Sequence, residues 1–216
     1  MKTLAKPFCR WGITGEIGAG KSTVAGYMAD FGIPVLNLDS IAKTIMVSNI
    51  ELREQIKAEF GEQAYLGKEI NKNYLSNQAF KSGQVHRLNA LVHPKVYSEV
   101  ARLELKFSEQ GHRIIAKESA LLLQQGRPNE IDVVIWVKTS KELRRHRISQ
   151  RPNLTNSDRD ARISYQSSLN LSQHLNPNCD KIISNNKTKE DLKTQVSGLI
   201  SELKIECDTL LQSRNL

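Results

Sequence analysis

Hydrophobic and polar positions along the chain follow two periods, one typical of strands and one of helices. Apolar residues fill 8–14, a glycine-rich stretch follows, and hydrophobic side chains then recur at helical spacing over 24–31. Gly32 is a helix-ending residue, and PVLNL at 34–38 predicts a second strand that ends at Asp39. The chain therefore begins as strand, glycine loop, helix and strand.

The middle of the chain has a different pattern. From about residue 40 to 110 apolar residues recur with the helical period, most clearly over 85–107, and we expect no strand there. After Gly111, the stretches HRIIAKES, IDVVIWVKT and CDKIISNN contain short runs rich in Ile and Val, typical of buried parallel strands. An amphipathic helix over 189–211 is expected to close the fold.

This alternation of strands and helices predicts an α/β fold of three layers, with a parallel five-stranded sheet. We expect residues 8–43, 111–140 and 178–216 to form the core. Because ligands of such sheets bind beyond the carboxyl ends of the strands, residues 44–110 would be a helical substrate-binding insertion. The polar stretch 141–177 would be a lid region.

Composition excludes several classes of protein. The 216 residues are 39% hydrophobic and 25% charged, and no apolar run approaches the roughly 20 residues that cross a bilayer. No signal-like stretch precedes the first strand, and the 3 cysteines form no CxxC pair, so we expect a cytoplasmic protein without a membrane partner. The net charge of +8 favours polyanions, but the basic residues are dispersed and aromatic residues few, so nucleic acid is not expected.

The stretch GEIGAGKS at 15–22 matches the phosphate-binding pattern G-x-x-x-x-G-K-S. It lies after a predicted strand and before a predicted helix, as its chemistry requires. The backbone can turn its N–H groups inward at Gly15, Gly18 and Gly20, with Ala19 between the last two. The dipole of the following helix adds positive potential. The sequence therefore predicts a polyphosphate site, a P-loop.

Three residues after these glycines have distinct expected roles. Lys21 would reach the β- and γ-phosphates, and the Ser22 hydroxyl would coordinate Mg²⁺ that bridges the same oxygens. Thr23 is expected to contact the α-phosphate. A polyphosphate bound together with Mg²⁺ is thus expected at this loop.

The other motifs favour a small-molecule kinase among P-loop proteins. A GTPase would carry NKxD, but NKTK at 186–189 lacks the acid, and a motor ATPase strand would end in an acid where this chain has Lys138. A kinase needs a group that takes the proton of the attacking hydroxyl, and Asp39, beyond the second strand, is placed for that. On local sequence alone, Asp39 could instead be the N-cap of the next helix.

Four stretches together resemble the dephospho-coenzyme A kinase family: ITGEIGAGKSTVA with FGIPVLNLDSIAK, LNALVHPKV, RISQR, and CDKIISNN. The P-loop is shared by many families, but its spaced combination with the other three is much more specific. The resemblance extends over nearly the whole chain. It implies a P-loop kinase that phosphorylates the ribose 3′-hydroxyl of dephospho-coenzyme A with ATP and Mg²⁺, the last step of coenzyme A synthesis.

The resemblance also implies roles for single residues. Asp39 is similar to the family's candidate general base, Arg147 to a lid arginine that neutralises the moving phosphoryl group, and Asn185 to a residue near adenine. His93 and Arg151 are expected on the substrate side. Both arginines could instead be solvated surface charges, and a histidine on an apolar helix is more often packed than catalytic.

The chain departs from the family pattern at two places. Asn37 stands where the family commonly has the first acid of D-x-D, and ALLLQQ at 120–125 replaces PLLFE. Glu118 lies close to the second departure and is expected to supply the missing charge to the substrate pocket. Two alternatives stay open: a nucleoside or nucleotide kinase of the same fold, and a nucleotide-binding regulator of little activity. We expect a monomer, with weak self-association as the alternative.

Overall fold

The computed structural model describes residues 7–78, 84–124, 126–150, 163–164 and 179–213. The chain divides into two compact units, one formed by Met1–Leu36 with Phe107–Leu216 and the other by Asn37–Lys106. Arg151 and most of the expected lid lie outside the described residues.

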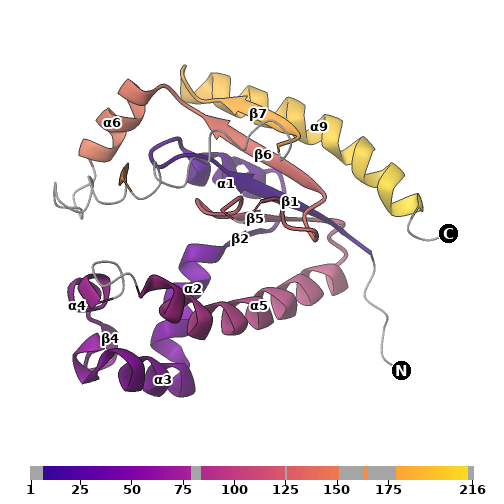
Figure 1. The fold of residues 1–216 in the computed structure, drawn as a ribbon. Coiled ribbons are helices and arrows are strands. Elements are labelled where there is room, and N and C mark those ends of the chain that lie inside the picture. The colour runs from indigo at the N-terminus through magenta and orange to yellow at the C-terminus, as the bar shows by residue number, and fades with distance from the viewer. Residues whose placement is uncertain (1–6, 79–83, 125, 151–162, 165–178, 214–216) are drawn as a thin grey trace, which may run out of the picture. The chain divides into compact units, whose positions relative to one another are not determined.

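The sheet of the first unit consists of β1 (Cys9–Thr14), β2 (Val35–Asn37), β5 (Ile114–Glu118), β6 (Val133–Lys138) and β7 (Lys181–Ser184). Its strand order is β2-β5-β1-β6-β7, so β1 is central (Figure 1). β1 is parallel to β5 and to β6, and β6 is parallel to β7. The α/β class with a five-stranded parallel sheet is confirmed.

Helices α1 (Lys21–Asp30) and α9 (Lys189–Ser213) cover one face of this sheet. Trp11 of β1, Met28 of α1 and Leu203 of α9 are fully buried in the shared core. Each such side chain contributes about 1.5 to 3 kcal/mol to stability by leaving water. Gly32 ends α1 as its position predicted, because it adopts left-handed backbone with φ 79° and its N–H bonds to a carbonyl of the last turn.

The other face of the sheet is covered by the connection between β5 and β6. Leu123 and Ile131 of this connection pack with Val134 and Trp136, which alternate with the residues of β6 that face the helices. Gly12 allows the close approach, since a Cβ at that position would collide with a leucine of the connection. Both faces of the central strands are therefore buried.

The second unit contains α2 (Leu38–Ser48), α3 (Ile50–Phe60), the 3-10 turn η1 (Glu62–Ala64), β3 (Tyr65–Leu66), β4 (Glu69–Ile70), α4 (Lys72–Ser76) and most of α5 (Val85–Glu109). The helical pattern over 85–107 is confirmed by α5. The expectation that no strand interrupts this block is wrong, because β3 and β4 pair as an antiparallel hairpin. Strands of two residues are too short to show an alternating pattern.

Contacts outside the hairpin stabilise it. The Tyr65 hydroxyl donates to the Met46 carbonyl over 2.7 Å, and Arg53 donates to the Gly67 carbonyl over 2.9 Å. The Arg53 guanidinium also lies 5.1 Å from the centre of the Tyr65 ring. The hairpin is thus tied to α2 and α3, which explains why so short a pair of strands forms.

The expected end of the second strand is also wrong. β2 ends at Asn37, and α2 begins at Leu38, so Asp39 lies in the first turn of a helix rather than at a strand end. The reason is local: the Asn37 Oδ1 accepts a hydrogen bond from the Ser40 N–H over 2.7 Å and caps the helix. The N-cap is therefore Asn37, not Asp39.

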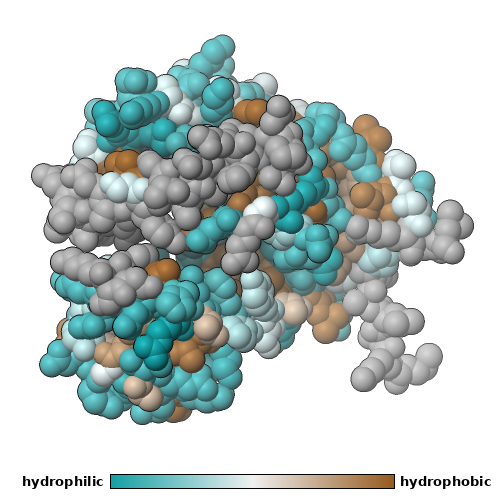
Figure 2. All heavy atoms as spheres, in the orientation of Figure 1, coloured by the Kyte–Doolittle hydropathy of each residue, from teal (hydrophilic) through white to brown (hydrophobic). Residues whose placement is uncertain are grey.

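The surface drawn in Figure 2 is largely hydrophilic, with hydrophobic residues in small separate areas. Exposed large hydrophobic side chains include Ile50 and Ile205. In the part of the chain that the structure describes, no helix has the length and hydropathy needed to cross a bilayer.

Candidate functional site

The P-loop joins the end of β1 to the start of α1. Gly15, Gly18 and Gly20 all have positive φ, of 149°, 79° and 94°. A Cβ on Gly15 would collide with the Val137 carbonyl, and one on Gly20 with the Asn185 amide nitrogen. Glycine is therefore required at these positions by both backbone conformation and close packing.

The lysine of the motif is held inside the loop. Lys21 is only 9% exposed, and its ammonium donates to the Gly15 carbonyl over 2.9 Å and to the Glu16 carbonyl over 3.3 Å. Gly20 is the N-cap of α1 and offers no side-chain cap for the first-turn N–H groups. A buried cation beside a helix N-terminus is a favourable place for phosphate.

Oxygen donors suitable for Mg²⁺ occur at the same helix start. Ser22 is exposed and Thr23 half-buried in the first turn of α1. Magnesium in phosphoryl-transfer sites takes few protein oxygens, keeps water, and binds mainly to substrate phosphates. The described residues contain no group of three or more His, Cys, Asp or Glu side chains that could hold a metal on its own. A single hydroxyl ligand fits that mode of binding.

Helix α6 (Lys141–Ser149) brings two arginines to the loop. Arg144 forms an ion pair with Glu16 at 2.9 Å, and Arg147 donates from one terminal nitrogen to the Asn185 carbonyl over 3.1 Å. The other terminal nitrogen of Arg147 is buried and has no hydrogen-bond partner among the described residues, and it lies 3.8 Å from the position that a Cβ on Gly20 would take. A guanidinium nitrogen thus faces the P-loop.

Asn185 follows β7 and is 7% exposed. Its amide nitrogen donates to the Ala19 carbonyl over 2.8 Å, and its side-chain oxygen lies 3.4 Å from the Arg147 guanidinium. Thr139, which follows β6, donates to the same Ala19 carbonyl over 2.9 Å. The P-loop is therefore held by side chains from two neighbouring strands.

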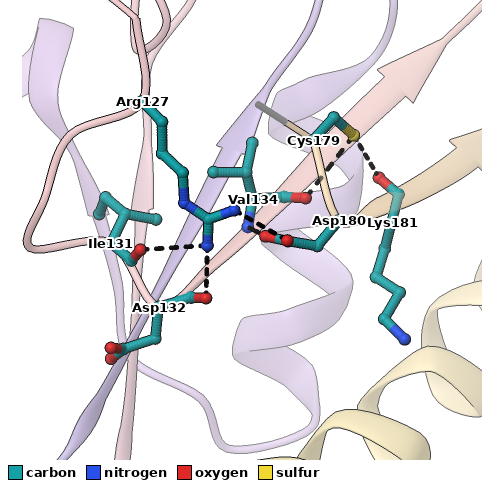
Figure 3. Close-up of polar contacts among 7 residues, drawn as sticks. All are labelled: Arg127, Ile131, Asp132, Val134, Cys179, Asp180 and Lys181. Atoms are coloured by element: carbon teal, nitrogen blue, oxygen red, sulfur yellow. Dashed lines mark hydrogen bonds and ion pairs between the residues drawn. The ribbon is translucent and has the colours of Figure 1, made fainter. Parts of the chain in front are cut away.

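Figure 3 shows the opposite end of β7, where Asp180 anchors the strand. One Asp180 oxygen accepts from the Val134 N–H over 2.7 Å, and the other accepts from Arg127 over 2.8 Å. Arg127 also donates to the carbonyls of Ile131 and Asp132. Asp180 and Asn185, both part of CDKIISNN, thus fix the two ends of one short strand.

Glu118 ends β5 beside the exit of β1. It is 7% exposed and pairs in register with Ile13, whose carbonyl accepts from the Ser119 N–H over 3.1 Å. The structure therefore brings Glu118 to the strand end from which the P-loop starts.

Asp39 and His93 belong to the second unit. Asp39 is exposed in the first turn of α2. His93 is exposed on α5, and its ring meets the Tyr97 ring edge-on at 5.9 Å. His93 is therefore not a packed core histidine.

A groove of about 640 Å³ lies within the second unit, between α2 and α5. Hydroxyl and charged side chains line much of it, together with isoleucines: Ser40, Ile41, Thr44, Ile45, Ser48, Asn49, Lys95, Ser98 and Glu99. Ser40, which lines the groove, follows Asp39 directly in the sequence.

Comparison with known proteins identifies the family. The family model for dephospho-CoA kinase matches residues 10–191, which include the P-loop, the whole second unit and Asn185. The chain belongs to the dephospho-CoA kinase family. The dephospho-CoA kinase of Salinibacter ruber is 30% identical over 190 residues, covering 87% of this chain and 94% of that protein.

A second relative agrees with this assignment, and a solved structure shares the fold. The dephospho-CoA kinase of Chlorobium luteolum is 31% identical over 198 residues, 89% of each chain. The crystal structure of TT1252 from Thermus thermophilus is 27% identical, with a TM-score of 0.75, and covers 92% of this chain and 99% of its own.

Sequence reasoning missed two residues of this dephospho-CoA kinase family member. Thr139 follows the carboxyl end of a strand, the sheet edge where ligands of such folds bind, and that position could have indicated it. Arg144 stands one turn before Arg147 on α6, but spacing alone does not distinguish it from a solvated charge.

Proposed function

We propose that this protein transfers the γ-phosphoryl group of ATP to the ribose 3′-hydroxyl of dephospho-coenzyme A. The observation that carries the proposal is the P-loop, with Lys21 buried inside it and the Arg147 guanidinium facing it, in a chain of the dephospho-CoA kinase family.

On the donor side, the loop N–H groups and Lys21 would bind the β- and γ-phosphates, and the first turn of α1 would orient the α-phosphate through Thr23. Ser22 would hold Mg²⁺, which when bound offsets phosphate charge. The buried Arg147 nitrogen, which has no partner within the part of the chain that the structure describes, would stabilise negative charge on the transferred group. Asn185 would lie beside the nucleotide while holding Ala19.

On the acceptor side, Asp39 would take the proton of the 3′-hydroxyl. The hydroxyl oxygen forms a bond to the γ-phosphorus, the bond between that phosphorus and the bridging oxygen breaks, and ADP leaves with those electrons. The groove of the second unit would bind the remainder of dephospho-coenzyme A, with His93 on the acceptor side. Residues 44–110 would serve as the acceptor-binding insertion and 141–177, with Arg151, as the lid.

The replacement of the first acid of D-x-D by Asn37 is compatible with this mechanism. A helix cap requires a side-chain oxygen, and Asn37 supplies it at 2.7 Å from the Ser40 N–H. Asp39 therefore keeps its place in the first turn of α2. Glu118, at the end of β5, would supply the substrate pocket with the negative charge that the altered segment ALLLQQ lacks.

The test is an assay of purified protein with ATP, Mg²⁺ and dephospho-coenzyme A, with coenzyme A and ADP measured by mass spectrometry. Asp39→Asn should lower kcat by about 10² to 10⁴-fold, the usual contribution of a general base. Lys21→Ala should remove turnover. Asp30→Asn, an exposed aspartate at the end of α1, is the matched control and should retain wild-type turnover.

The alternatives predict other results. Preferred phosphorylation of a nucleoside or nucleoside monophosphate would replace the proposed acceptor. ATP binding without turnover of any acceptor would indicate a nucleotide-binding regulator. Full turnover by Asp39→Asn would reject Asp39 as the base while leaving the reaction itself intact.

A further inference from the structure

The Ala19 carbonyl, in the P-loop, is held by side chains that follow two different strands. Two side chains donate to it, the Thr139 hydroxyl at 2.9 Å and the Asn185 amide at 2.8 Å. A carbonyl oxygen has two lone pairs, so these two donors occupy both. Thr139 is 5% and Asn185 is 7% exposed, and water competes little for either bond.

Holding this carbonyl fixes the direction of a neighbouring N–H group. The peptide between Ala19 and Gly20 is planar and trans, since the described chain has no cis peptide bond, so its C=O and N–H point to opposite sides. With the carbonyl turned toward Thr139 and Asn185, the Gly20 N–H is directed away from them. Without these donors, the loop would lose the contacts that set this peptide's orientation.

Asn185 also holds Arg147 of α6. The Asn185 carbonyl oxygen accepts from the Arg147 guanidinium over 3.1 Å. The Asn185 side-chain oxygen lies 3.4 Å from the same guanidinium nitrogen. The second terminal nitrogen of Arg147 is left facing Gly20.

We propose that Thr139 is a positioning residue of the phosphate site: together with Asn185, which also holds the Arg147 guanidinium, it fixes the Ala19 peptide in the orientation that binds the triphosphate. This inference rests on the proposed function for the identity of the nucleotide. Thr139 would act through the loop, by holding the Ala19 carbonyl together with Asn185, rather than through contact with phosphate.

The test compares Thr139→Val with Thr139→Ser. Valine keeps the shape and removes the hydroxyl, whereas serine keeps the hydroxyl. We expect the Kd for ATP, measured by calorimetry with Mg²⁺ and without acceptor, to rise about tenfold in the valine variant, as the loss of one buried hydrogen bond predicts. The serine variant should return to within about twofold of wild type. Thr194→Val, on the exposed side of α9, is the matched control and should bind ATP like wild type.

Kinetics separate positioning from mere stability. In Thr139→Val the KM for ATP should rise while the KM for dephospho-coenzyme A changes less than about twofold. A purely structural role would reduce the folded fraction, and hence the binding stoichiometry and kcat, with an unchanged Kd. Asn185→Asp, which faces the Ala19 carbonyl with an oxygen in place of a nitrogen, should weaken ATP binding further than Thr139→Val.

Wild-type affinity for ATP in Thr139→Val, or a serine variant as weak as the valine one, would overturn the inference. Wild-type protein that binds no ATP would overturn it together with the proposed function. ATP binding without phosphorylation of dephospho-coenzyme A would remove the proposed function alone, because the Kd comparison needs no acceptor.

Discussion

Asp180→Ala tests how much one carboxylate contributes to holding β7 in the sheet. The substitution removes the acceptor of the Val134 N–H and the ionic partner of Arg127. Arg127 would keep its bonds to the carbonyls of Ile131 and Asp132, so its position should change little. The loss is therefore confined to Asp180 and the two groups that it accepts from.

The magnitude follows from the exposure of these groups. The Arg127 and Asp180 side chains are 29% and 35% exposed, so their ion pair contributes only about 0.2 to 1 kcal/mol. Leaving the Val134 N–H without its acceptor costs about 1 to 3 kcal/mol. We expect a total of about 1 to 4 kcal/mol, which lowers Tm by about 2 to 16 °C in a protein of this size.

Thermal and urea unfolding followed by circular dichroism measure this loss. Asp208→Ala is the matched control, because Asp208 also pairs with an arginine, at 3.1 Å, but both side chains are more than half exposed. The control should lose less than about 1 kcal/mol. A Tm for Asp180→Ala within about 1 °C of wild type, or equal effects of the two substitutions, would refute the argument.

Three further predictions concern other parts of the chain. Gly20→Ala puts a Cβ on backbone with φ 94° and against an amide nitrogen, so we expect calorimetry to show more than about tenfold weaker ATP binding. Tyr65→Phe removes the 2.7 Å hydrogen bond to the Met46 carbonyl and should cost about 1 kcal/mol in urea unfolding. Hydrogen bonds from the Thr188 hydroxyl and N–H hold the pKa of Asp191 below its usual value. The stability that the protein gains from these bonds to the Asp191 carboxylate is present above the unfolded-state pKa and is lost as pH falls through the folded-state pKa. Thr188→Val should therefore lower the urea midpoint more at neutral pH than in acid.

The central part of the fold could be predicted because its signals are local. Buried parallel strands appear as short Ile- and Val-rich runs, and Gly32 marks the end of α1. The hairpin of β3 and β4 could not be predicted in the same way, since each strand has two residues and the Tyr65 contact to Met46 is tertiary. The end of β2 could not be placed from the apolar pattern, because Leu38 continues that pattern although it already belongs to the helix that Asn37 caps.

The same distinction between local and long-range signals applies to the residues of the site. The glycines and Lys21 form a contiguous motif, so the sequence alone predicts the loop and its ligand class. Thr139 and Arg144 reach the loop from segments more than a hundred residues away, and although Thr139 follows a strand end, the sequence does not show which part of the loop either residue contacts. Only the arrangement of the strands brings them to Ala19 and Glu16.

Asn185 has a structural role in the phosphate site that its sequence motif does not indicate. Its expected place beside adenine stays a prediction, and in the structure its amide nitrogen holds the P-loop carbonyl of Ala19 while its oxygens face Arg147. Four residues of β7 separate it from Asp180, whose carboxylate fixes the other end of that strand. A shift of the strand by one residue would therefore turn the Asn185 amide away from Ala19, because successive side chains of a strand point to opposite faces. The clamp at Asp180 and the geometry of the phosphate loop are thus linked through a single short strand.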